Sequence, residues 1–135
     1  MLIALVDGAH INHEAAHRWI GTERPWATCP LTQNGFARIL SNPAYPTITA
    51  SPADVVEALR QLVASPRHLE IWDDVSLADE TLFDPSALAS SRQVTDTYLL
   101  GLAHRHGLGL ATFDRKIRHE AVVGATPESV TLISA

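Results

Sequence analysis

The chain has 135 residues, of which 46% are hydrophobic and 19% charged, a composition typical of a single folded domain and not of a disordered or fibrous chain. The lone cysteine, Cys29, has no partner for an internal disulfide, which excludes disulfide scaffolds and thiolate zinc sites and indicates a reducing compartment. A net charge of -5 excludes a protein that coats nucleic acid through bulk positive charge. The first apolar run ends at Asp7, too short for a signal peptide or a membrane span, so we expect a cytoplasmic location and no membrane partner.

The first half of the chain predicts three helices and two strands. A helix is expected over residues 13–22, an extended segment over 26–29, a helix over 30–40 opened by Pro30, a helix from Ser51 to about residue 65, and a strand over 68–72. The periodicity of residues 1–6 alone fits a strand or a helix. The inward positions expected for these helices are Ala15, Ala16, Trp19, Ile20, Phe36, Ala37, Ile39, Leu40, Val56, Leu59 and Leu62.

The second half predicts an acidic loop, one long helix and two strands. The loop covers residues 73–84 around a short helical turn, and its acids Asp73, Asp74, Asp79 and Glu80 are expected to be solvated. The helix covers 94–106 and ends at Gly107, a buried strand covers 108–113, and a last strand covers 130–133. Strands that alternate with helices indicate an α/β fold with a parallel sheet covered on both faces.

Residues His13 to His17 match the H-E-x-x-H pattern, which places two zinc-binding imidazoles and a glutamate base on one helical turn. A zinc hydrolase is therefore one hypothesis. The apolar stripe of this helix is centred on Trp19, which turns Glu14 and His17 away from the core. A solvated helix face is the interpretation that we favour.

Two aspartates form a stronger candidate site. Asp96 lies in the first turn of the long helix, on the arc of its apolar residues, and Asp114 directly follows the strand 108–113. Helix starts and the carboxyl ends of parallel strands meet at one edge of a sheet, so we expect these carboxylates to be neighbours that suit a hard divalent cation. A capping role for Asp96 remains the alternative.

Two further polar features accompany the aspartates. Arg115, Lys116 and Arg118 form the densest basic cluster in this acidic chain, which indicates either a solvated turn or a surface that holds a phosphate backbone. Gln33 lies on the inward arc of its helix, where a hydrogen-bonded buried amide is the plain interpretation.

The segments 2–6, 10–19, 26–36, 40–43, 92–96 and 110–114 together resemble the PIN domain, specifically the VapC toxins of type II toxin–antitoxin systems. This resemblance implies a three-layer α/β/α fold with a central parallel sheet and one domain over residues 1–135. It implies that Asp96 and Asp114 hold Mg²⁺ or Mn²⁺, that Gln33 stands at the position of a catalytic glutamate, and that Arg115, Lys116 and Arg118 contact RNA. The implied activity is hydrolysis of RNA phosphodiester bonds, with a tRNA or rRNA substrate, a VapB-type antitoxin and a homodimeric assembly.

The chain departs from the family pattern at two acidic positions. Members begin with a strand that ends in an aspartate, whereas Met1 aligns beyond it, so we expect that strand to be missing and residues 1–6 to be a helix remnant. Gln33 supplies an oxygen but no negative charge. A catalytically degenerate module that binds an antitoxin or dimerises is therefore the second hypothesis, and the zinc hydrolase is the third.

Overall fold

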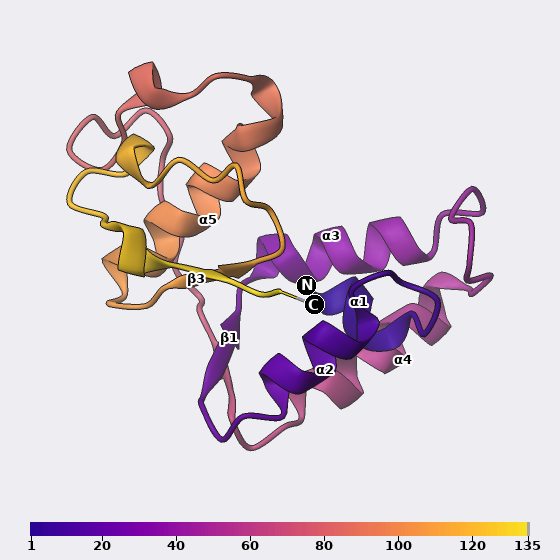
Figure 1. Ribbon diagram of the computed structural model, residues 1–135. Coiled ribbons are helices and arrows are strands. Elements are labelled where there is room, and N and C mark those ends of the chain that lie inside the picture. Colours follow the sequence, from indigo (N-terminus) through magenta and orange to yellow (C-terminus); the bar gives the residue numbers. More distant parts are fainter. Residues whose placement is uncertain (135) are drawn as a thin grey trace. The chain divides into compact units, whose positions relative to one another are not determined.

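A computed structural model describes residues 1–134 and divides them into two compact units, residues 1–72 and 73–134 (Figure 1). Helices and short parallel strands alternate in each unit. This confirms the α/β class, although the parallel strands form two pairs in place of one continuous sheet within the described residues. None of the helices in residues 1–134 combines the length and the apolarity needed to cross a membrane.

The first unit packs four helices with one pair of strands. Its elements are α1 (Leu2–Val6), α2 (His13–Ile20), β1 (Trp26–Thr28), α3 (Pro30–Leu40), α4 (Pro52–Val63) and β2 (His68–Glu70). β1 and β2 run parallel, with Thr28 opposite Glu70 at their carboxyl ends. Phe36 and Leu40 of α3 pack against Val55 of α4, and the apolar residues of α1 cover this core.

The second unit is built around one long helix. Its elements are the 3-10 helices η1 (Pro85–Ala87) and η2 (Ser91–Gln93), then α5 (Val94–Arg105), β3 (Leu110–Thr112), η3 (His119–Ala121), η4 (Pro127–Ser129) and β4 (Val130–Leu132). β3 and β4 are parallel, with Leu110 opposite Val130. The core consists of Phe83, Leu100 and Val122, each at most 4% exposed. A short strand pair thus sits beside the helix that carries Asp96 (Figure 1).

Local signals fixed most helix boundaries. Pro30 opens α3, and Ser51 caps α4 by accepting a hydrogen bond from the Asp54 backbone N–H. Gly107 follows α5 with φ 67, the left-handed conformation that glycine adopts without strain. Residues 2–6 form a helix, which decides between the two interpretations of their periodicity.

Three predictions about burial were wrong. Val56 was expected to be buried but is 36% exposed, whereas its neighbour Val55 is 3% exposed. The reason is that Val55 is the residue of α4 that packs against Phe36 and Leu40 of α3. Ile39 is 37% exposed, since Phe36 and Leu40 define the core arc of α3 and Ile39 lies at its margin. The strand expected to be buried at 108–113 is half-buried and limited to Leu110–Thr112.

Asp7 connects the end of α1 to the loop that precedes α4. It is 3% exposed. Its Oδ2 accepts hydrogen bonds from the hydroxyls of Tyr45 (2.7 Å) and Thr47 (2.6 Å), and its Oδ1 accepts one from the Ala9 backbone N–H (3.0 Å). These donors satisfy the buried carboxylate.

Replacing Asp7 by asparagine should lower the thermal midpoint at pH 7 by about 5 °C, because an amide nitrogen at the Oδ2 position cannot accept from two hydroxyls. The bonds from Thr47 and then Tyr45 hold the pKa of Asp7 below its usual value. Its stabilising effect is therefore present above the unfolded pKa of about 4 and is lost as the pH falls through the folded pKa. Circular dichroism melts from pH 3 to 7 should show the difference from wild type shrinking in acid.

Asp74→Asn is the matched control, because Asp74 is exposed in the acidic loop. It should change the midpoint little at any pH. A difference between Asp7→Asn and wild type that stays constant from pH 3 to 7 would contradict the role given to the Asp7 carboxylate.

Candidate functional site

Asp114 lies in the turn that directly follows β3. Its backbone N–H donates to Thr112 Oγ1 (3.0 Å), and its Oδ1 accepts from the Lys116 backbone N–H (2.8 Å). The side chain is exposed. These bonds orient the carboxylate at the carboxyl end of a parallel strand, where α/β proteins bind their ligands.

Asp96 lies in the first turn of α5 and is half-buried. Burial raises the pKa of its carboxyl above the ordinary value, and the negative charge of Asp114 raises that pKa further. α5 packs against β3, the strand that Asp114 follows, and the charge of Asp114 acts on Asp96. A cation shared by the two carboxylates stays a prediction. A divalent cation between such groups would offset the repulsion, and carboxylate oxygens are the ligands that it prefers.

The capping explanation for this helix start has no support in the geometry. The N-cap residue is Gln93, and the helix has no side-chain capping bond there. The amide of Gln93 instead donates from Nε2 to the Lys116 backbone carbonyl (3.0 Å) and accepts at Oε1 from the Ala89 N–H (2.8 Å). This amide ties the loop after Asp114 to the start of the helix that carries Asp96.

The basic cluster follows Asp114 within that loop. Arg115, Lys116 and Arg118 are all exposed. None of the three makes an ion pair with another residue of the described part of the chain. Three uncompensated cations beside a pair of carboxylates are suited to phosphate groups of a ligand.

Gln33 belongs to a second polar group, which we call the β1–β2 cluster: Thr28, Gln33, His68 and Glu70. Gln33 Nε2 donates to Thr28 Oγ1 (2.9 Å) and to Glu70 Oε2 (2.5 Å). His68 Nε2 lies 2.8 Å from Thr28 Oγ1. The inward amide predicted from the sequence is thus hydrogen-bonded, at the carboxyl ends of β1 and β2.

Sequence reasoning missed Glu70 and His68. Both lie within a short segment that predicts a strand. Nothing local marks Glu70 as a partner of Gln33, 37 residues earlier, or His68 as a partner of Thr28, 40 residues earlier. The signal is tertiary: the register of β1 and β2 places Glu70 opposite Thr28, five residues before Gln33.

His17 of the H-E-x-x-H pattern is exposed, as expected, and His13 is half-buried, but both rings also contact the backbone of α1. His13 Nδ1 lies 2.8 Å from the Ala4 carbonyl oxygen and His17 Nε2 lies 2.9 Å from that of Leu5. A carbonyl only accepts, so both rings donate to the last turn of α1, whose carbonyls have no partner within so short a helix. Their role is to join α2 to α1.

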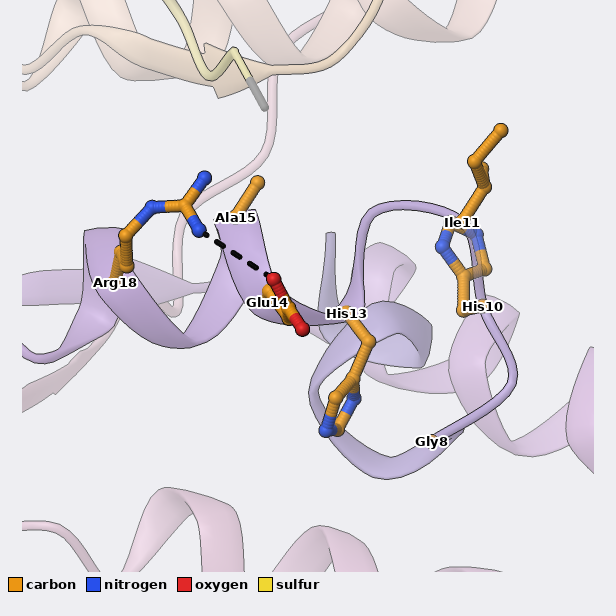
Figure 2. A pocket seen from close by; sticks show the side chains of 7 residues that line it. All are labelled: Gly8, His10, Ile11, His13, Glu14, Ala15 and Arg18. Atoms are coloured by element: carbon orange, nitrogen blue, oxygen red, sulfur yellow. Dashed lines mark ion pairs between the residues drawn. The ribbon is translucent and has the colours of Figure 1, made fainter.

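Glu14 of the same pattern takes part in a surface ion pair. Its Oε2 lies 3.8 Å from Arg18 Nη1, with both side chains more than half exposed. Figure 2 shows this pair beside His13 and His10 around a hollow of about 310 Å³ that Ile11 also lines. No group of three metal-binding side chains of the His, Cys, Asp and Glu types is gathered in residues 1–134. The zinc hydrolase is therefore not favoured.

Comparison with known proteins gives a consistent family. The PIN domain model matches residues 1–122. The chain is 43% identical to "Ribonuclease VapC44" of Mycobacterium tuberculosis strain H37Rv, over 98% of this chain and 94% of that protein. It is 41% identical to "Ribonuclease VapC38" of the same strain, over 84% of this chain and 79% of the relative. "Ribonuclease VapC39" is 36% identical over 92% and 91%.

Proposed function

Because the chain belongs to the PIN domain family, we propose that it is the toxin of a type II toxin–antitoxin module, an endoribonuclease that hydrolyses RNA phosphodiester bonds. The observation that carries this proposal is the placement of Asp96 in the first turn of α5, which packs against β3, with Asp114 directly after that strand. Burial and then the charge of Asp114 raise the pKa of Asp96. Neighbouring carboxylates of this kind are held together by a divalent cation in phosphoryl-transfer sites.

PIN ribonucleases generally depend on a divalent metal, and the residues present fit one. Asp96 and Asp114 supply carboxylate oxygens at a strand end, and we propose Mg²⁺ or Mn²⁺ as the ion. When bound, such an ion lowers the pKa of water and neutralises charge that develops on the phosphate. Gln33 occupies the position of the family's glutamate, where its amide orients neighbours but cannot accept a proton as a base.

The basic cluster is proposed to hold the RNA backbone. Arg115, Lys116 and Arg118 are exposed cations in the loop that Gln93 ties to the start of α5. Contacts to phosphate position a substrate without reading its sequence. A structured tRNA or rRNA is the substrate class that the family relation supports.

Partner and location are proposed on the family relation alone. They are a VapB-type antitoxin that silences the enzyme, assembly as a homodimer, and a cytoplasmic location. We also propose that both compact units belong to one PIN domain, since the family match runs through the boundary between them. A degenerate binding module is the competing hypothesis, and the charge pair at Asp96 and Asp114 favours the enzyme over it.

The direct test is cleavage of total cellular RNA by the purified chain. We expect cutting in Mg²⁺ or Mn²⁺ that stops when a chelator removes the metal. Each cut should leave a 5'-phosphate on the downstream fragment and a 3'-hydroxyl on the upstream one. End-labelling of the products with and without phosphatase treatment identifies that group. Intact RNA at all metal concentrations, from protein that is folded by circular dichroism, would favour the degenerate module.

A further inference from the structure

The β1–β2 cluster contains a buried carboxylate oxygen without a partner. Glu70 Oε2 accepts from Gln33 Nε2 at 2.5 Å, but Glu70 Oε1 is buried and has no hydrogen bond in the described part of the chain. The Glu70 side chain is only 19% exposed. A buried negative charge is costly unless a cation or donors compensate it, so an unsatisfied oxygen here indicates a missing ligand.

The groups around Glu70 do not neutralise it. His68 Nε2 lies 3.9 Å from Glu70 Oε2, beyond hydrogen-bond distance, in a side chain that is 5% exposed. The ring is occupied elsewhere, because His68 Nε2 lies 2.8 Å from Thr28 Oγ1. Glu70 is left with one neutral amide as its hydrogen-bond donor.

Gln33 presents a second oxygen in the same cluster. Both of its side-chain hydrogen bonds, to Thr28 and to Glu70, are made by Nε2. An ionised carboxylate cannot donate, so the bond to Glu70 fixes the orientation of the amide and leaves Gln33 Oε1 as an acceptor. At the carboxyl ends of β1 and β2, the buried Glu70 Oε1 thus lacks a hydrogen-bond donor in the described part of the chain, and Gln33 Oε1 can accept.

We propose that Glu70 and Gln33 together bind a hydrated divalent cation, with Glu70 supplying the negative charge that position 33 lacks. Mg²⁺ commonly keeps several waters and takes only one or two protein carboxylates, so a site of this composition suits it. The inference rests on the proposed function, which gives the reason for a second metal-binding group in this chain. Glu70 of β2 would thus be a metal ligand, a role that the local sequence around it does not indicate.

Mn²⁺ binding tests this site without RNA. Titrations followed by electron paramagnetic resonance are made on Asp114→Asn protein, so that the Asp96 and Asp114 pair contributes little. Glu70→Gln in that protein should weaken Mn²⁺ binding by about 10-fold or more. Gln33→Glu should strengthen it by about 10-fold, because a second carboxylate then faces the ion. Glu23→Gln, on an exposed glutamate, is the control and should leave the affinity unchanged.

Thermal stability separates a metal ligand from a structural residue. Mn²⁺ should raise the thermal midpoint of the Asp114→Asn protein and fail to raise that of the protein that also carries Glu70→Gln. Gln33→Glu should be less stable than its parent in chelator, where two carboxylates face each other, and should gain more from Mn²⁺. This second variant keeps the test decisive if Glu70→Gln does not fold.

The outcomes for this inference and for the proposed function are distinguishable. Equal Mn²⁺ affinity with and without Glu70→Gln, or weaker binding in Gln33→Glu, overturns the metal role of Glu70 even if wild type cuts RNA. Intact RNA after incubation with wild type overturns the proposed function, whereas the loss of Mn²⁺ binding in Glu70→Gln would still support the cation site.

Discussion

Asp114→Asn should reduce the rate of RNA cleavage by at least about 100-fold, the usual effect of losing a charged group that stabilises a transition state. Asp114 is exposed and its Oδ1 accepts only a local bond from the Lys116 N–H. An asparagine oxygen can accept that bond, so the fold should survive. The measurement is single-turnover cleavage of a fixed RNA at saturating Mg²⁺, with circular dichroism to verify folding.

Asp96→Asn should reduce the rate of RNA cleavage by a factor similar to that of Asp114→Asn. The same substitution should stabilise the metal-free protein at pH 7. Burial first, and the charge of Asp114 second, raise the pKa of Asp96. A raised folded pKa means that stability is fully present below the unfolded value of about 4 and is lost as the pH rises through the folded pKa. A neutral asparagine avoids that loss. The positive end of the helix dipole favours the charged form of Asp96. Burial and the charge of Asp114 outweigh this effect, because the pKa of Asp96 is raised.

Urea unfolding in chelator at pH 4 and pH 7 measures the effect. The stability advantage of Asp96→Asn over wild type should be larger at pH 7 than at pH 4. Asp84→Asn is the contrasting variant: hydrogen bonds from Ser86 lower the pKa of Asp84, so its replacement should not stabilise the protein at pH 7. An Asp96→Asn protein that is less stable than wild type at pH 7 would show that Asp96 is needed for the helix and not for a ligand.

Helix boundaries were predictable because their signals are local. Pro30, the pair Ser51 and Pro52, and Gly107 each restrict the backbone or satisfy its free groups within one turn. The positions of Asp96 in the first turn of α5 and of Asp114 directly after β3 were also predictable, since both follow from local helix and strand signals. The site residues themselves stay a prediction until metal binding is measured.

The remaining features depend on contacts that no local pattern encodes. Glu70 meets Gln33 only through the register of β1 and β2, and His13 and His17 bond to backbone carbonyls only because α1 ends beside them. The wrong choice of Val56 over Val55 as the buried residue of α4 has the same origin, since Val55 is the residue that packs against α3. Tertiary packing overrides periodicity at such positions.

Gly101→Ala should destabilise the protein by about 1 to 3 kcal/mol, the usual cost of forcing an extra methyl group into a packed core. Alanine is the better helix former by about 1 kcal/mol, which favours the opposite result. At Gly101, however, an added Cβ would overlap the ring of Phe83, which is 4% exposed and belongs to the core of Phe83, Leu100 and Val122. A buried ring has little room to move, so we expect the overlap to outweigh the helix propensity.

Gly35→Ala is the matched control for this prediction, because Gly35 also lies inside a helix but an added Cβ there meets no atom within 4 Å. It should gain about 0.5 to 1 kcal/mol from helix propensity alone. Urea unfolding of both variants should therefore give changes in the free energy of unfolding of opposite sign.

Gly101→Ala should keep RNA cleavage at 25 °C. The Phe83 ring should shift in response to the added methyl group, and the hydrogen-bonded backbone of α5, which positions Asp96, should stay in place. Equal stabilisation by the two substitutions would mean that Phe83 leaves space for a methyl group on α5.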